Sequence, residues 1–81
     1  MISLTLYSTA GCHLCELAEE LLREAQTQVN LQWQWTEIVD SKDLMEHYAV
    51  RIPVVAEPVS GAEIGWPFDQ SDLQRWLSQF G

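Results

Sequence analysis

A C-x-x-C motif lies between a run of residues with strand periodicity and a run with helix periodicity. Residues 8–15 (STAGCHLC) contain both cysteines of the chain. Residues 2–7 alternate apolar and polar side chains, with the period of a half-buried strand. Residues 14–25 carry leucines and alanines at i, i+3, i+4 and i+7, which predicts an amphipathic helix with one face on the core. The motif is therefore expected in the turn between them and in the first helical turn, the arrangement of a dithiol redox site.

Length and composition predict one small domain over residues 1–81. A hydrophobic content of 47% with four tryptophans is enough for one modest core. No apolar run approaches the roughly 20 residues that span a bilayer. Met1 runs straight into the first predicted strand, without the basic and apolar regions of a signal peptide. We therefore expect a cytoplasmic protein, in which a cysteine pair is more often catalytic or metal-binding than structural.

Charge narrows the range of partners. Four Lys/Arg against twelve Asp/Glu give a formal net charge of −8. A surface of this sign repels phosphate backbones, so no nucleic-acid partner is expected. It attracts cationic partners and gives anionic small molecules, glutathione included, no long-range attraction. An acidic composition is also common in soluble proteins, so charge alone assigns no function.

The middle of the chain predicts a second strand, a short helix and a third strand. Residues 31–39 begin with the alternation of a strand, and Asp40 or Ser41 can cap a short helix after them. Residues 50–56 form the third apolar run, which Pro53 interrupts. A proline there indicates either an edge strand or a special turn at the start of the strand.

The last third predicts a hairpin and a closing helix. Residues 59–62 supply the turn and residues 63–65 the returning strand. Asp69 is placed as the N-cap of a helix with Asp72 in its first turn, followed by apolar residues at helical spacing, Leu73, Trp76, Leu77 and Phe80. The predicted order is β-α-β-α-β-β-α, with a parallel first strand-helix-strand unit and an antiparallel final hairpin.

This order resembles the thioredoxin fold and, within it, the glutaredoxins. Residues 7–12 (YSTAGC) are similar to the glutaredoxin lead-in to the first cysteine. Ile52-Pro53 occupies the place of the family's cis-proline dipeptide, and residues 61–65 (GAEIG) resemble its Gly-Gly hairpin. Residues 66–69 (WPFD) are closer still to small bacterial glutaredoxin-like proteins. The resemblance covers nearly the whole chain and implies an α/β three-layer sandwich with a four-stranded mixed sheet.

The sequence also departs from the usual glutaredoxin pattern. Thr9 replaces a lysine, His13-Leu14 replaces Pro-Tyr, Arg51 replaces a threonine, and Trp66 replaces a second glycine. In the family most of these groups contact glutathione. The resemblance therefore supports the fold more strongly than it supports glutathione binding.

The two cysteines have different predicted roles. Thiol–disulfide exchange needs a thiolate nucleophile and a second thiol that resolves the mixed disulfide. Cys12 is expected at the helix start, where backbone N–H groups and the helix dipole can lower a cysteine pKa to roughly 3.5–7.5, against about 8.5 for a free one. Cys15 lies one turn later and is expected to be more buried. We assign Cys12 as nucleophile and Cys15 as resolving thiol; the alternative is two buried cysteines that share this spacing by coincidence.

Two neighbours of the pair are candidates for tuning its pKa. His13, as a cation, favours the Cys12 thiolate, or it points into solvent without a role. Glu16 raises the thiol pKa if it lies near the sulfur, although its more common role is to complement the helix dipole.

The predicted substrate-binding residues are Arg51, Ile52, Pro53, Trp66 and Asp69. A cis Pro53 presents the Ile52 backbone to an extended substrate, whereas an edge-strand proline makes no such contact. Arg51 is expected either to meet a substrate carboxylate or to be solvated, and Trp66 to shape a peptide surface or join the core. Asp69 corresponds in the family to a residue near the glutamyl end of glutathione, while its position favours an N-cap.

Three functions remain open. The first is a thiol–disulfide oxidoreductase, expected to be a monomer without cofactor, acting on a protein disulfide or on a low-molecular-weight thiol such as glutathione. The second is metal or iron–sulfur handling through Cys12, His13, Cys15 and His47, although only one of the two cysteine pairs of a closed zinc site is present and no metal site is predicted. The third is a non-catalytic module whose acidic surface binds a basic partner.

Overall fold

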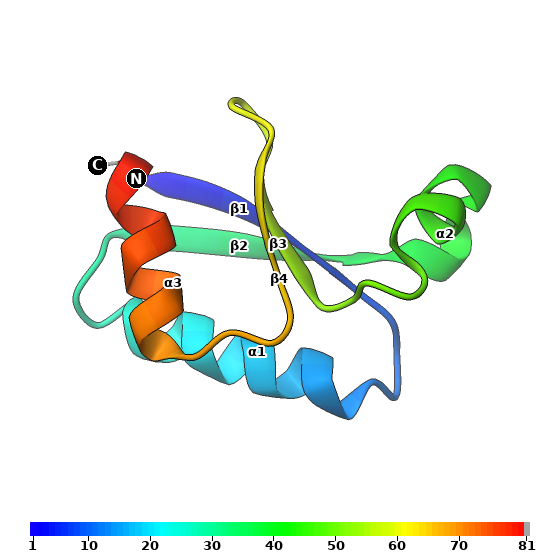
Figure 1. Ribbon diagram of the computed structural model, residues 1–81, viewed down its shortest axis with the longest axis horizontal. Helices are drawn as coiled ribbons and strands as arrows, with labels where there is room; N and C mark the ends of the chain where they lie inside the picture. Colours follow the sequence, from blue (N-terminus) through cyan, green and yellow to red (C-terminus); the bar gives the residue numbers. More distant parts are fainter. Residues whose placement is uncertain (81) are drawn as a thin grey trace.

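The computed structural model describes residues 1–80 and confirms the predicted order around a four-stranded mixed sheet with strand order β2-β1-β3-β4 (Figure 1). β1 (Ile2–Ser8) runs parallel to β2 (Leu31–Glu37). β3 (Val54–Glu57) pairs antiparallel with β1, and β4 (Ala62–Gly65) pairs antiparallel with β3. The loop that leads to Cys12 therefore follows β1, one of the two central strands of the sheet.

The helices cover the two faces unequally. α1 (His13–Ala25) and α3 (Gln70–Leu77) lie over one face, and their buried residues form one core cluster with β1 and β3. α2 (Lys42–Tyr48) follows the short 3-10 helix η1 (Ile38–Asp40) and covers only one end of the other face (Figure 1). A second 3-10 helix, η2 (Ser78–Phe80), ends the described chain.

The alternation along β1 decides which side chains reach each face. Leu4 and Leu6 are buried against α1 and α3. Tyr7 points to the opposite face, where it packs with Tyr48 and Val54. The period-2 pattern read from the sequence is therefore the pattern of burial.

Several expected boundaries move. β2 ends at Glu37, and residues 38–40 turn into η1 rather than continuing the strand to Val39. The third strand begins at Val54, not near Val50, which is 98% exposed in the turn after α2. Leu14, expected on the buried stripe of the first helix, is 44% exposed because it lies on the first turn of α1, beyond the part of the helix that joins the core cluster.

Pro53 resolves the alternative posed by the sequence. The edge-strand interpretation is wrong, because β3 lies between β1 and β4. The special-turn interpretation is confirmed: the Ile52–Pro53 bond is cis and comes directly before β3. The chain reaches this turn through backbone hydrogen bonds from Arg51 and Ile52 to the Tyr48 carbonyl, at 2.8 and 3.1 Å.

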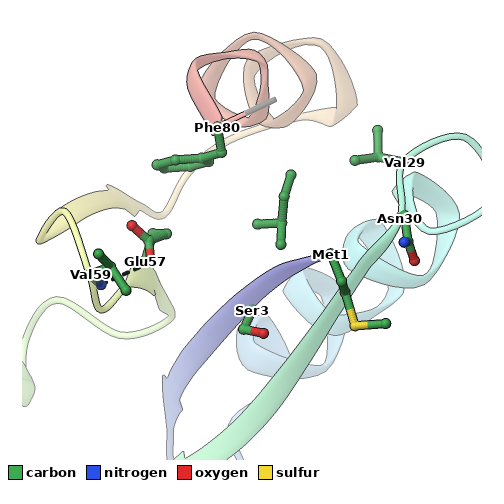
Figure 2. A pocket seen from close by; sticks show the side chains of 8 residues that line it. Met1, Ser3, Val29, Asn30, Glu57, Val59 and Phe80 are labelled. Carbon is green, nitrogen blue, oxygen red and sulfur yellow. Dashed lines mark hydrogen bonds between the residues drawn. The ribbon is translucent and has the colours of Figure 1, made fainter.

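The two ends of the described chain lie together, at the end of the sheet opposite the cysteine loop (Figure 1). Met1 and Phe80 line the same open pocket, with Val29, Glu57 and Val59 among the other lining residues (Figure 2). Neither cysteine lines this pocket; both lie at the other end of the sheet.

Candidate functional site

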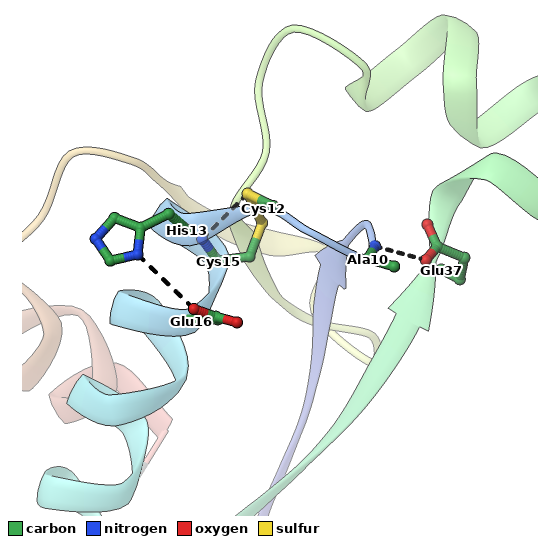
Figure 3. The surroundings of a disulfide bond; sticks show 6 residues. All are labelled: Ala10, Cys12, His13, Cys15, Glu16 and Glu37. Carbon is green, nitrogen blue, oxygen red and sulfur yellow. Dashed lines mark hydrogen bonds and ion pairs between the residues drawn. A yellow bond between two sulfur atoms is a disulfide. The ribbon is translucent and has the colours of Figure 1, made fainter.

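Cys12 and Cys15 form a disulfide at the N-terminus of α1 (Figure 3). Cys12 is the N-cap residue, with extended backbone angles of φ −85° and ψ 106°, and its Sγ accepts a hydrogen bond from the Cys15 backbone N–H at 3.1 Å. The two Cα atoms are 5.2 Å apart. Cys12 is half-buried while Cys15 has no exposed surface, so only Cys12 is open to an incoming sulfur atom.

The loop before Cys12 is held by its own turn and by the end of β2. Gly11 has a φ of +79°, a left-handed conformation that favours glycine, and the Cys12 N–H donates to the Thr9 carbonyl at 3.3 Å. The Ala10 N–H donates to the Glu37 carboxylate at 2.9 Å (Figure 3). A hydrogen bond from the Thr9 hydroxyl, followed by backbone N–H groups including that of Ala10, holds the pKa of Glu37 below its usual range.

Sequence reasoning missed Glu37 as part of this site. It was read as an interior residue of a strand, whereas it is the last residue of β2 and lies in register with Ser8, the last residue of β1. The available signal was this pairing: parallel strands end at the same edge of the sheet, so a carboxylate at the end of one reaches the loop that follows the other.

His13 turns away from the disulfide. Its Nδ1 lies 3.7 Å from the Glu16 carboxylate, and its side chain is 78% exposed (Figure 3). The structure therefore pairs the two residues that the sequence considered as tuning groups for Cys12. Their contact is a surface pair across one helical turn, of the kind that contributes little to stability.

The loops around the disulfide converge because strand ends meet at one edge of the sheet. Tyr7, the next-to-last residue of β1, is in register with Val54, the first residue of β3. Val54 is in turn in register with Gly65, the last residue of β4. The cysteine loop, the Ile52–Pro53 turn and the segment beginning at Trp66 therefore leave the sheet at the same end. A hydrogen bond of 3.1 Å from the Trp66 N–H to the Pro53 carbonyl joins the last two.

Arg51 is engaged by a polar network on the α2 side of the sheet. Its Nη2 lies 2.8 Å from one oxygen of Glu63, and the Tyr48 hydroxyl donates to the other oxygen at 2.5 Å. The Tyr48 ring stacks on Tyr7, with centroids 4.2 Å apart. The hydroxyl and then Arg51 lower the pKa of Glu63, whereas burial and then Glu63 raise the pKa of Tyr48. Arg51 thus has a partner within the chain, and a substrate carboxylate would have to compete with Glu63.

The segment before α3 has one expected feature and one unexpected one. Asp69 is the N-cap of α3, as predicted: it accepts from the Asp72 N–H at 2.8 Å while the Asp72 carboxylate accepts from the Asp69 N–H at 3.1 Å. The hydrogen bond that the Asp69 carboxylate accepts from the Asp72 N–H is the main cause of the lowered pKa of Asp69. The Trp66–Pro67 bond is a second cis peptide, which was not anticipated. Trp66 is half-buried and contacts Phe68 edge to face, with ring centroids 5.1 Å apart.

Comparison with known families supplies the identification. The family described as "Glutaredoxin-like domain (DUF836)" matches residues 3–78. The chain belongs to this glutaredoxin-like family. No match is found among curated proteins.

Solved structures support the same assignment for the glutaredoxin-like domain. The X-ray structure of protein XcR50 from X. campestris is 37% identical in sequence, covers 96% of this chain and 99% of its own, and superposes with a TM-score of 0.82. The solution structure of XcR50 has a TM-score of 0.80, with coverage of 96% and 95%. Protein Ne2328 from Nitrosomonas europaea is 25% identical, with coverage of 91% and 88% and a TM-score of 0.80.

Within the described part of this glutaredoxin-like domain, no three His, Cys, Asp or Glu side chains are grouped so as to share a metal ion. His47, considered from sequence as a fourth soft ligand, contacts the Tyr48 ring edge to face on α2. Over residues 1–80 no helix has the length and apolar character needed to cross a membrane.

Proposed function

We propose that this glutaredoxin-like domain is a thiol–disulfide oxidoreductase that uses the Cys12–Cys15 dithiol. The observation that carries the proposal is the asymmetry of the pair. The half-buried Cys12 sulfur caps the helix and accepts the Cys15 N–H at 3.1 Å, while Cys15 is fully enclosed. A backbone N–H aimed at a sulfur stabilises its anion more than its thiol, and the thiolate is the attacking species.

The exchange proceeds in two steps that balance sulfur and electrons. The Cys12 thiolate attacks one sulfur of the substrate disulfide, forms a mixed disulfide and releases the other substrate sulfur as a thiolate. The Cys15 thiolate then attacks Cys12 Sγ, which frees the second substrate thiol and forms the Cys12–Cys15 disulfide seen here. Two electrons pass to the substrate, and a thiol reductant restores the dithiol.

The surrounding loops supply positions for the substrate. The Ile52–Pro53 turn lies at the same end of the sheet as Cys12, and because the Ile52 N–H already donates to Tyr48, an extended chain would pair with the Ile52 carbonyl. The proposed substrate is a disulfide of a protein or of a low-molecular-weight thiol, and the domain acts as a monomer. Arg51 and Asp69 are already engaged by Glu63 and Asp72, so they contribute less to substrate binding than their positions in the sequence implied.

Serine substitutions at the two cysteines test the proposal and control for each other, because the chemical change is the same at both positions. The reduced protein is incubated with a disulfide peptide, quenched in acid, alkylated and weighed intact. We expect Cys12→Ser to lower exchange at least about a thousandfold, since the nucleophile is lost. Cys15→Ser is expected to accumulate a mixed disulfide on Cys12, because nothing resolves it.

Two results contradict the proposal. One is full exchange activity in both variants. The other is a wild-type pair whose redox state does not change across a series of glutathione redox buffers. A reversible glutathione adduct on Cys12 within that series identifies glutathione as a substrate, and a disulfide that forms without the adduct identifies protein disulfides instead.

A further inference from the structure

A groove runs along α1, between this helix and the segment that joins β4 to α3. Leu17 and Leu21 form one side of its floor, and Trp66 and Phe68 form the other. Its volume is about 330 Å³. The Gln70 side chain donates to the Leu21 carbonyl at 3.1 Å, which ties the start of α3 to α1 and fixes the width of the groove at that point.

The rim of this groove is acidic. Glu20, Glu24 and Asp69 line it, and no Lys or Arg does. Over residues 1–80, neither Glu20 nor Glu24 has an ion-pair partner, and Arg23 lies against Glu19 at 3.1 Å instead. The groove thus combines an apolar floor with two carboxylates, Glu20 and Glu24, that form no ion pair within residues 1–80. We refer to it as the acidic groove.

The acidic groove is continuous with the surroundings of the disulfide. Leu14, Leu17 and Leu21 are spaced i, i+3 and i+7, so an apolar stripe on α1 leads from the exposed Leu14 into the groove. At the other side, the Trp66 N–H donates to the carbonyl of Pro53. With a rise of about 1.5 Å per residue, Leu17 and Leu21 lie roughly 7.5 and 13.5 Å along α1 from Cys12.

We propose that the acidic groove binds a cationic, apolar segment of a substrate protein: one large apolar side chain flanked by Lys or Arg. Since an extended chain advances about 3.4 Å per residue, this segment lies about two to four residues from the substrate cysteine. Burial of its apolar side chain on Leu17, Leu21 and Trp66 supplies affinity. The carboxylates select the flanking cations and disfavour the net-negative glutathione disulfide. The role of the groove in substrate selection rests on the proposed exchange activity, whereas peptide binding to the groove can be measured without that activity.

Binding is tested without redox chemistry. The double variant Cys12→Ser/Cys15→Ser is titrated with two cysteine-free peptides, one with leucine between lysines and one with leucine between glutamates. We expect the lysine peptide to bind at least about tenfold more tightly, with NMR shifts at the Leu17 and Leu21 methyls and the Trp66 indole. Equal affinities, or shifts that leave the groove unaffected, overturn the proposal. Concentration-dependent shifts of the same signals without peptide identify a second copy as the occupant and also overturn it.

A matched pair of charge variants separates the groove from the general field of an acidic protein. Glu20→Gln/Glu24→Gln and Asp43→Asn/Glu46→Gln each remove two carboxylates from the formal charge of −8. With the lysine peptide carrying a disulfide, we expect the first variant to lower kcat/KM about fivefold and the second to leave it unchanged. Equal losses in both variants show a long-range effect and contradict a local site.

The two proposals fail in different ways. A protein that binds the lysine peptide in the groove but exchanges no disulfide refutes the oxidoreductase and leaves the docking site standing. A protein that exchanges lysine peptide, glutamate peptide and glutathione disulfide at equal rates, without NMR shifts in the groove, refutes the docking site and leaves the oxidoreductase standing.

Discussion

The two faces of the sheet are built differently. On the face covered by α1 and α3, ten buried residues form one continuous core cluster. On the α2 face the buried cluster has three members, Ile38, Tyr48 and Val54, with the partly buried Tyr7, Leu44 and Ile52 packed against it. Glu63 adds polar contacts with Tyr48 and Arg51 on this face. The first face is packed like the interior of an ordinary domain. On the second face Tyr48, Arg51 and Glu63 form a hydrogen-bonded cluster, which we call the polar clamp.

The α1 and α3 face should therefore determine mainly the folding stability, and the α2 face mainly the geometry of the candidate site. The continuous core supplies most of the buried apolar area, which is the main favourable contribution to folding. The α2 face contributes less area, but it holds Arg51 and Ile52, the residues that lead into the cis-proline turn beside Cys12. Damage to the first face should therefore appear mainly in the free energy of unfolding. Damage to the second should appear mainly in the exchange rate.

Adjacent valines on β3 give the sharpest test of this separation. Val55 faces α1 and α3, Val54 faces α2, and both have no exposed surface. We expect Val55→Ala to lower the free energy of unfolding by about 2.5 kcal/mol, and Val54→Ala by about 1.5 kcal/mol because partly exposed neighbours can close around the smaller side chain. Val54→Ala should slow exchange more, since Val54 follows Pro53. Urea denaturation and exchange kinetics measure the two effects, and the reverse ranking in either measurement contradicts the comparison.

Removing the Tyr48 hydroxyl tests the polar clamp without changing the apolar packing of the ring. Tyr48→Phe keeps the ring stacked on Tyr7 and removes the hydrogen bond to Glu63. We expect a loss of about 1 kcal/mol in the free energy of unfolding, together with a slower exchange rate. Gln32→Ala is a control on the same face, because it removes only an exposed contact with Ser3. If the two variants behave alike, the clamp has no role in the site.

Acid pH should also weaken the polar clamp, and we expect it to lower the free energy of unfolding by less than Tyr48→Phe does. The pKa of Glu63 is lowered from 4.5 by the Tyr48 hydroxyl and by Arg51, so the carboxylate adds stability above its unfolded-state pKa and loses it as the pH falls through the folded value. The difference in urea midpoint between wild type and Glu63→Gln should therefore be largest near neutrality and shrink below about pH 4.5. A difference that does not change with pH contradicts this account.

Local patterns predicted most of the fold. The alternation before Cys12, the helical spacing after it and the Asp69 cap are properties of short segments, and short segments determine strands, helices and caps. The cis bond before Pro53 followed from the family resemblance and is confirmed. The exposure of Val50 was not predicted, because whether an apolar residue lies in a turn depends on where the preceding helix ends.

Contacts between distant segments were the part that sequence reasoning missed. Glu37 reaches Ala10 across 27 positions, and Tyr48 reaches Glu63 across 15. Both depend on which strand ends share an edge of the sheet, and the strand order β2-β1-β3-β4 is needed to deduce it. Arg51 was expected either to meet a substrate carboxylate or to be solvated, and its contact with the Glu63 carboxylate was not foreseen.

The position of the chain ends has a practical consequence. Met1 and Phe80 line one pocket, and the ends of the described chain lie at the end of the sheet opposite the start of α1, where the disulfide lies (Figure 1). A tether attached near either end therefore leaves Cys12 facing away from the support. The domain can be immobilised on an electrode or a bead through this end while its sulfur chemistry remains open to solution. Under the proposed exchange activity, a Cys15→Ser variant immobilised in this way would capture mixed-disulfide partners in one orientation.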